Sequence, residues 1–112
     1  MKRYAVIVWL LLVVVGDARA LAAEFMVVPN ELWDRPRTGR GVLDTPGIRQ
    51  AVQLLLARPN AGLVIHHGRG QDPQLAAEEL RAWLIALAVE AARISLSNDL
   101  QGNEPLKLEV TP

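Results

Sequence analysis

The spacing of hydrophobic residues changes along the chain and predicts an alternation of helices and strands. Two stretches repeat apolar side chains at helical spacing, which predicts two helices that each bury one face. The apolar positions are Ile48, Val52, Leu55 and Leu56 in the first stretch and Ala76, Leu80, Trp83, Leu84 and Leu87 in the second. We expect Asp44 or Thr45 to cap the first helix and Asp72 to cap the second, because a proline suited to a first helical turn follows in both places.

Four shorter stretches favour β-strands. Residues 25–28 form a short apolar run that a proline ends, and residues 63–65 form a run without alternation, which is typical of a central strand covered by helices. Residues 92–96 predict a third strand, and residues 106–110 predict a fourth with regular alternation of apolar and polar side chains. The turn-rich segment 97–105 is expected to close a hairpin between the last two strands.

The resulting order is strand, helix, strand, helix, strand, strand (β-α-β-α-β-β). Strands that alternate with helices argue for a sheet that is partly parallel, with right-handed crossovers. We therefore predict an α/β fold of the α+β sandwich type, with a mixed sheet and two helices packed on one face. The hydrophobic fraction of 51% suits a globular chain, but part of that fraction belongs to the N-terminus and not to the fold.

The N-terminus has the layout of a secretory signal peptide. Lys2 and Arg3 precede an apolar run from Tyr4 to Val15, and small residues follow. The run is shorter than the roughly 20 residues that a membrane-spanning helix needs. We predict a signal peptide over residues 1–22; the alternative is an uncleaved anchor, through which alone the chain would contact a membrane. In either case the rest of the chain lies in the periplasm or cell envelope.

Removal of residues 1–22 changes the charge balance. This segment holds three of the 12 basic residues and one of the 12 acidic residues, so the remainder has a formal charge of −2. A mildly acidic chain lacks the surplus of Lys and Arg that phosphate neutralisation requires, which argues against nucleic acid as a partner. The chain has no cysteine, so disulfides and thiolate metal sites are excluded.

The residues that could serve catalysis or ligand binding are concentrated in residues 63–73, LVIHHGRGQDP. His66 and His67 are neighbours at the end of a strand, so their side chains point to opposite faces and cannot easily share one metal ion. With no further histidine and no cysteine, we predict no metal site and no cofactor. The serines lie outside any nucleophile-elbow pattern, so we predict no enzymatic activity; a small enzyme that uses His66 or His67 is the alternative.

The glycines of the same stretch favour a binding loop. Gly68-Arg69-Gly70 leads into a helix start, where free backbone N–H groups favour an anion and Arg69 can add a charge-assisted hydrogen bond. Ligands of open sheets tend to bind beyond the carboxyl ends of parallel strands, which is where this loop is expected. The competing interpretation is a solvated strand-to-helix turn.

Residues 33–41 predict an irregular basic loop. Trp33, Arg35, Arg37 and Arg40 lie there among prolines and glycines. Loops on rigid scaffolds often carry function, so these four residues form a candidate interaction loop. A solvated connector is the alternative.

Three stretches carry a resemblance to a known family. They are LVIHHG, a strand that runs into a glycine-containing loop; AEELRAWLIALAVEAARISL, a helix, its turn and the next strand; and NEPLKLEV, a last strand. Over residues 42–110 the order of elements resembles the OmpA-like domain, the peptidoglycan-associating module of bacterial envelope proteins. We therefore divide the chain into a signal peptide (1–22), an N-terminal strand with the basic loop (23–41) and an OmpA-like domain (42–112).

The resemblance implies a site for the diaminopimelate group of the peptide stem, built from an aspartate after the second strand and an arginine early in the second helix. A carboxylate and a guanidinium suit the ammonium and the carboxylate of that group. The corresponding region here holds His67, Arg69, Asp72 and Arg81, which are the candidate ligand-binding residues. It departs from the family pattern, because His67 to Gly70 follow the strand and the helix has no arginine before Arg81.

We predict an exported, non-enzymatic binding or structural module that contacts peptidoglycan or an envelope protein. The ligand or partner is expected at the Arg69 loop and the basic loop. Besides the small enzyme, an accessory subunit of an envelope or secretion complex, joined through an exposed sheet edge, is an alternative.

Overall fold

The computed structural model of the chain describes residues 22–112. The predicted signal peptide, residues 1–22, therefore lies outside the described residues except for Ala22. None of the described helices is long and apolar enough to cross a membrane. The described part folds into one four-stranded sheet and three α-helices, where the sequence predicts two.

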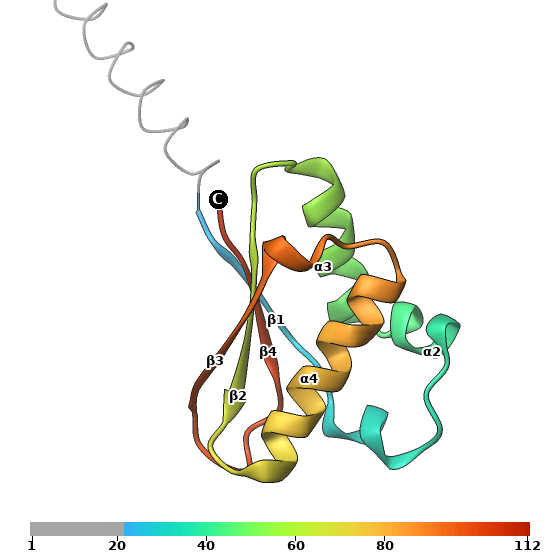
Figure 1. Cartoon of the computed structure of the whole chain (residues 1–112), viewed down its shortest axis with the longest axis vertical. Coiled ribbons are helices and arrows are strands. Elements are labelled where there is room, and N and C mark those ends of the chain that lie inside the picture. The colour runs from blue at the N-terminus through green and yellow to red at the C-terminus, as the bar shows by residue number, and fades with distance from the viewer. Residues whose placement is uncertain (1–21) are drawn as a thin grey trace, which may run out of the picture.

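Helices and strands alternate along the described chain (Figure 1). In chain order they are β1 (Glu24–Val27), the 3₁₀ helix η2 (Asn30–Asp34), α2 (Gly39–Asp44), α3 (Pro46–Ala57), β2 (Leu63–Gly68), α4 (Gln71–Ala86), the 3₁₀ helix η3 (Ala91–Arg93), β3 (Ile94–Leu100) and β4 (Lys107–Val110). The predicted mixture of helices with a mixed sheet is confirmed.

The strands lie in the order β1-β4-β2-β3. β2 and β3 are parallel and are joined through α4, whereas β4 runs antiparallel to both of its neighbours, β1 and β2. β3 and β4 are therefore not paired, and the predicted hairpin around residues 97–105 is wrong. Burial explains the difference: Leu108 and Val110 are fully buried, which suits an inner strand, while the polar residues of β3 suit an edge.

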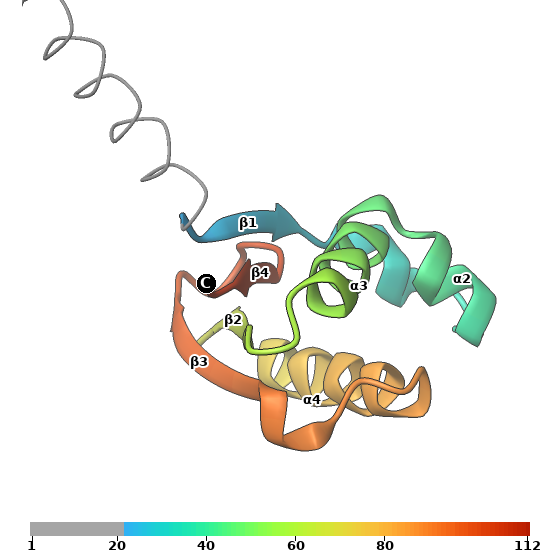
Figure 2. The same cartoon turned by 90° about the horizontal axis from the view of Figure 1, so that it is seen from above.

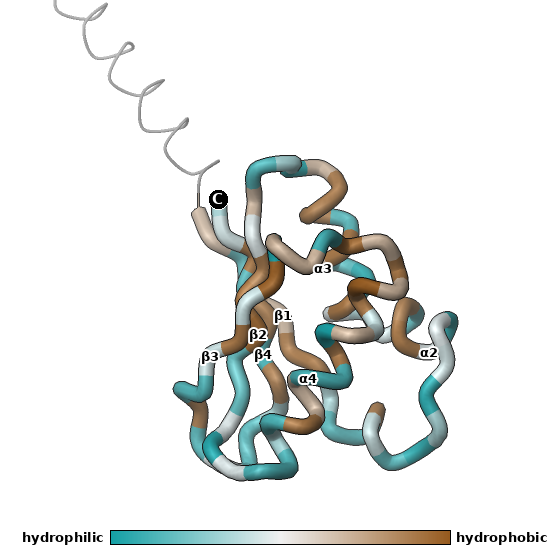
Figure 3. Tube along the Cα trace, viewed as in Figure 1, coloured by the Kyte–Doolittle hydropathy of each residue, from teal (hydrophilic) through white to brown (hydrophobic). Residues whose placement is uncertain are grey.

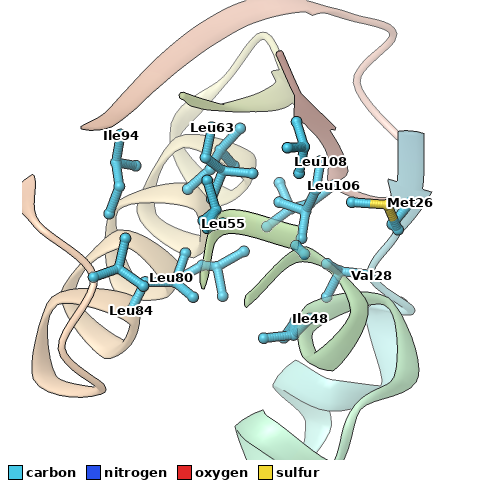
Figure 4. Packing of buried hydrophobic residues seen from close by; sticks show 14 of the residues in the cluster. Met26, Val28, Ile48, Leu55, Leu63, Leu80, Leu84, Ile94, Leu106 and Leu108 are labelled. Atoms are coloured by element: carbon cyan, nitrogen blue, oxygen red, sulfur yellow. The ribbon is translucent and has the colours of Figure 1, made fainter. Parts of the chain in front are cut away.

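The hydrophobic core lies between one face of the sheet and helices α3 and α4. Seen from above, both helices cover the same side of the sheet, and no helix of residues 22–112 lies on the opposite side (Figure 2). Alternate residues of β2 and β4 point into the core, because side chains of a strand alternate between its faces. The core residues labelled in Figure 4 are Met26, Val28, Ile48, Leu55, Leu63, Leu80, Leu84, Ile94, Leu106 and Leu108.

Helix α3 forms where the apolar spacing predicts it. Pro46 occupies its first turn, and the chain leaves helical geometry at Arg58, the residue before Pro59. The guanidinium of Arg93 donates hydrogen bonds of 2.8 and 2.7 Å to the carbonyl oxygens of Leu55 and Arg58. These carbonyls lie at the helix end, where intrahelical partners are missing, so Arg93 stabilises the end of α3.

The segment between β1 and α3 is more regular than predicted. The expected irregular loop over residues 33–41 contains the end of η2 and the start of α2. Two buried side chains, Leu32 and Val42, anchor the segment to the core. The Thr38 hydroxyl accepts a hydrogen bond of 2.9 Å from the Gly41 N–H, so a local cap starts α2 where the apolar spacing is too sparse to reveal a helix.

The predicted helix caps also need correction. Asp44 belongs to α2, whereas Thr45 occupies the capping position of α3 as predicted, although its side chain makes no capping hydrogen bond. Asp72 is not the cap of α4, because the helix already begins at Gln71. Gly70 takes the capping position with a φ of 120°, a conformation that glycine adopts readily and other residues avoid. Asp72 therefore lies inside the first turn of α4, and its carboxylate is not used to cap the helix.

Candidate functional site

A pocket lies where η2, the first turns of α4 and the loop after β3 meet. The start of α4 and the loop after β3 lie at the lower end of the molecule in Figure 1. A side chain at Gly68 would come within 2.7 Å of the Gln101 carbonyl oxygen, so glycine is needed for the β3–β4 loop to pack against the end of β2. Gly70 then turns the chain into α4. The loops at this end are largely hydrophilic, in contrast to the core (Figure 3).

The pocket has a volume of about 530 Å³ and is built from η2, the start of α4 and the β3–β4 loop. Its lining residues are Asn30, Trp33, Asp34, Asp72, Pro73, Ala76, Gly102, Asn103, Glu104 and Leu106. Three of them are carboxylic acids and none is basic, so the pocket favours a cationic group. We call it the Asp72 pocket.

The carboxylates of the Asp72 pocket have hydrogen-bonding capacity left for a ligand. Asp34 and Asp72 form no ion pair with any residue in the range 22–112. Glu104 accepts a hydrogen bond of 3.3 Å from the Gln101 N–H. Each carboxylate can accept several hydrogen bonds, so the pocket offers acceptors for an ammonium group.

Trp33 and Arg37, two residues of the predicted interaction loop, form one structural unit beside the pocket. The Arg37 guanidinium lies over the Trp33 ring, 5.6 Å from its centroid, and donates to the Trp33 carbonyl oxygen at 3.0 Å. It also donates hydrogen bonds of 2.7 and 2.9 Å to Glu79 on α4. These bonds hold the pKa of Glu79 below its usual value. Arg37 thus fastens η2 to α4 and holds Trp33 at the pocket.

The other arginines of the predicted interaction loop lie elsewhere. Arg35 lines a separate hollow of about 400 Å³ between η2 and α2, which Arg37, Glu31 and Asp44 also line. Arg40 is exposed on α2. The structure therefore places Trp33 and Arg35 at different hollows and commits Arg37 to an ion pair.

The four predicted ligand-binding residues are not brought together. Asp72 lines the pocket, whereas the exposed Arg69 does not. Arg81 follows Asp72 by nine residues on α4, which at about 100° per residue puts it on the opposite side of the helix. His67 points to the helix-covered face of the sheet and is buried.

His67 borders a third hollow, of about 410 Å³, between the start of α4 and β3. The residues that line it are His67, Gln74, Leu96, Ser97 and Asn98. The Nδ1 atom of His67 lies 2.9 Å from the Gly68 carbonyl oxygen, and since a carbonyl only accepts, Nδ1 is the donor. No carboxylate lines this hollow, so His67 lacks the acidic partner that would orient it for proton transfer.

The sequence does not reveal a second polar cluster, which lies on the uncovered face of the sheet. His66 of β2 stands between Asp99 of β3 and Glu109 of β4. Its Nδ1 lies 2.8 and 2.9 Å from the two carboxylate oxygens of Asp99, and its Nε2 lies 2.8 Å from Oε1 of Glu109. The alternation along β4 indicates which face Glu109 occupies, but only the strand order brings it beside His66. We call this the His66 cluster.

Both ring nitrogens of His66 face acceptors, so in this arrangement the ring carries two protons and a positive charge. Burial by itself lowers the pKa of His66, but the hydrogen bonds to Glu109 and Asp99 outweigh burial and raise the pKa above its ordinary value of 6.5. The bond to His66 in turn lowers the pKa of Asp99. Because neither nitrogen is free, His66 cannot accept a proton from Ser97, its neighbour on β3.

Within the described range 22–112, no three His, Asp or Glu side chains are arranged to hold a metal ion. Comparisons with protein-family models, curated proteins and solved structures found no match for the chain. The geometry of the Asp72 pocket and of the His66 cluster is therefore the basis for assigning a function.

Proposed function

We propose that this chain is an exported, non-enzymatic module of the cell envelope that binds peptidoglycan through the Asp72 pocket. The observation that carries the proposal is the position and charge of that pocket. Its three carboxylic acids come from η2, the first turn of α4 and the β3–β4 loop, and the last two of these elements follow the carboxyl ends of the parallel strands β2 and β3, where open sheets commonly bind ligands. The diaminopimelate group of a wall peptide carries an ammonium, which these carboxylates can hold by charge-assisted hydrogen bonds.

The resemblance to the OmpA-like domain supports the same function. It implies a ligand site after the second strand and at the start of the second helix, and Asp72 and Pro73 at the start of that helix line the Asp72 pocket. On the same grounds we propose that the fold is of the OmpA-like type, with β1 as part of its sheet.

The proposed recognition differs from that of the family in one respect. The resemblance implies an arginine for the carboxylate of the ligand, but neither Arg69 nor Arg81 lines the pocket. The Asp72 pocket therefore recognises the ammonium, while the Trp33 ring supplies an apolar wall for the adjoining carbon chain. An amine should bind whether or not a carboxylate stands beside it.

A catalytic function has less support. His66 has both nitrogens bonded to carboxylates, and the hollow beside His67 has no carboxylate. In the part of the chain that the structure describes, neither histidine combines a free nitrogen, a carboxylate partner and a hollow, which a general base acting on a substrate requires.

An accessory subunit of an envelope complex is the second candidate. The edge strand β1 exposes two large apolar side chains on the face without helices: Phe25 is 58% exposed and Val27 is 53% exposed. Apolar side chains along an open sheet edge favour pairing with another chain.

Co-sedimentation with purified peptidoglycan sacculi tests the proposed function. Asp72→Asn and Asp34→Asn remove charge from the pocket with little change in side-chain volume, and Glu90→Gln removes an exposed carboxylate outside it. We expect each pocket variant to bind about tenfold more weakly, since losing a charge-assisted hydrogen bond costs roughly 1.5–3 kcal/mol. Glu90→Gln should bind like the native chain. Equal binding by the native chain and all variants, or no binding by any, would refute the proposal.

A further inference from the structure

The His66 cluster brackets the loop that forms one wall of the Asp72 pocket. Asp99 lies in β3, two residues before the loop 101–106, and Glu109 lies in β4, three residues after it. Within this loop Gly102, Asn103, Glu104 and Leu106 line the pocket. The two strands that flank the pocket wall are thus both bonded to one side chain on the central strand β2.

The topology explains why one side chain can reach both ends. β3 and β4 lie on opposite sides of β2, so the loop between them crosses the end of β2. Its backbone packs so closely on Gly68 that a side chain there would meet Gln101 and Gly102. His66 precedes Gly68 on the same strand and points to the face without helices, between the two arms of the loop.

We infer that His66 is a positioning residue of the Asp72 pocket: as an imidazolium it fastens both ends of loop 101–106 to β2, and on losing a proton it releases one of them. The inference rests on the proposed function, because it concerns the regulation of the same pocket. Ligand affinity is then highest while His66 is charged.

The chemistry of the ring determines what is released. A neutral imidazole has one N–H donor and one bare nitrogen, so it can donate to only one of the two carboxylates. The side chain of Asp99 is 53% exposed and can bond to water instead, whereas the side chain of Glu109 is 23% exposed. The pairing of β2 with β3 is already irregular between His66 and Gly68. The end of β3 and the loop that follows it are therefore the part that loosens.

The groups that face His66 favour its charged form. Ser97 and Asp99 face it from β3, and Lys107 and Glu109 face it from β4, while α3 and α4 lie on the other side of the sheet (Figure 2). The two carboxylates outnumber the single ammonium of Lys107, so they stabilise a positive charge on the His66 ring. The raised pKa of His66, despite the burial that lowers it, agrees with this balance.

The first experiment follows the protein without any ligand. Protein purified from cells that express the full chain is isotope-labelled and titrated across neutral pH by NMR. We expect the backbone amide signals of Gly102 and Asn103 to shift with the same midpoint as the His66 ring. This shift should vanish in His66→Gln and persist in His67→Gln, the matched control at the neighbouring position.

A second variant keeps the test decisive if His66→Gln does not fold. Asp99→Asn retains the bond between His66 and Glu109 but removes the charge that holds the end of β3. In this variant the His66 ring still titrates, and the amides of Gly102 and Asn103 no longer follow it. The positioning role is wrong if these amide signals do not shift with the His66 midpoint in the native chain. It is also wrong if they still shift with that midpoint in Asp99→Asn.

The ligand experiment then measures binding to peptidoglycan sacculi on both sides of the His66 midpoint. We expect binding to be about fivefold or more weaker above the midpoint, within the usual range for coupling between two sites. The loop amides could respond to pH while the affinity for sacculi stays constant. That result would refute the inference that His66 regulates binding. Failure to bind at every pH would instead refute the proposed function, and the ligand-free titration would still decide the role of His66.

Discussion

The two faces of the sheet differ in what holds them together, and two adjacent histidines show the difference. His67 points toward the helices, is 6% exposed and makes one hydrogen bond to a backbone carbonyl. His66 points the other way and bonds to carboxylates on two neighbouring strands. Burial of apolar side chains stabilises the fold at every pH, whereas the His66 cluster does so only while its charges persist. The covered face thus provides stability, and the open face makes part of that stability depend on pH.

The largest effect is expected from a cavity on the covered face. Leu80 of α4 is fully buried, and Leu80→Ala should lower the free energy of unfolding by about 2–5 kcal/mol. Val27→Ala on the open face, where the side chain is 53% exposed, should change it by about 0.5 kcal/mol or less. Urea-induced unfolding measures both. Similar losses from the two variants would break the distinction between the faces.

Removal of a carboxylate from the His66 cluster should have the next largest effect. Glu109→Gln leaves the charged ring with a weaker partner and should cost roughly 1–2 kcal/mol of unfolding free energy in mildly acidic buffer. Asp99→Asn should cost less, because the side chain of Asp99 is 53% exposed and that of Glu109 is 23% exposed. Urea unfolding of both variants at one pH checks this order, and a larger loss from Asp99→Asn would reverse it.

The pH dependence of stability sharpens the comparison further. The pKa of His66 is raised in the folded chain, so its contribution is fully present below pH 6.5 and is lost as the pH rises through the raised value. The pKa of Asp99 is lowered, so its contribution is present above pH 3.8 and is lost as the pH falls through the lowered value. The cluster is complete between these limits. Unfolding measured from mildly acidic to basic pH should show a decline that His66→Gln removes and His67→Gln retains.

The smallest effect on stability is expected in the pocket. Asp72 lies in the first turn of α4, where a carboxylate interacts favourably with the helix dipole, and no described residue forms an ion pair with it. Asp72→Asn should therefore cost only about 0.3–1 kcal/mol in urea unfolding while it weakens binding to sacculi. A large loss of stability would instead mean that Asp72 serves the fold.

Local patterns predict most of the elements, because apolar spacing and proline positions act over a few residues. Helix α3 and the alternating strand β4 lie where these patterns predict them. The short helix α2 is stabilised by the Thr38 cap and by the burial of Val42. Residues 33–41 contain no repeated apolar spacing that would predict this helix. The absence of a β3–β4 hairpin depends on contacts between distant strands, which spacing does not reveal.

The residues of the candidate site also fall into those that local sequence patterns indicate and those that only the fold brings together. The helix-start signal marks Asp72 as a cap and the family resemblance marks it as a candidate ligand-binding residue, and the structure places it at the pocket without a capping role. Arg69 and Arg81 are near Asp72 in sequence, but exposure and helical rotation separate them from the pocket. Asp99 and Glu109 stand far from His66 along the chain, and only the sheet order brings the three together.

The most direct test of the Asp72 pocket is an NMR map of the isotope-labelled protein with soluble peptidoglycan fragments that carry the diaminopimelate peptide. The pocket predicts the largest shifts at the Trp33 indole N–H and at the amides of Gly102 and Asn103, with little change at Leu96 and Asn98 beside His67. The same shifts should be lost in Asp72→Asn and kept in Glu90→Gln. Shifts centred on Phe25 and Val27, or no shifts at all, would contradict the account.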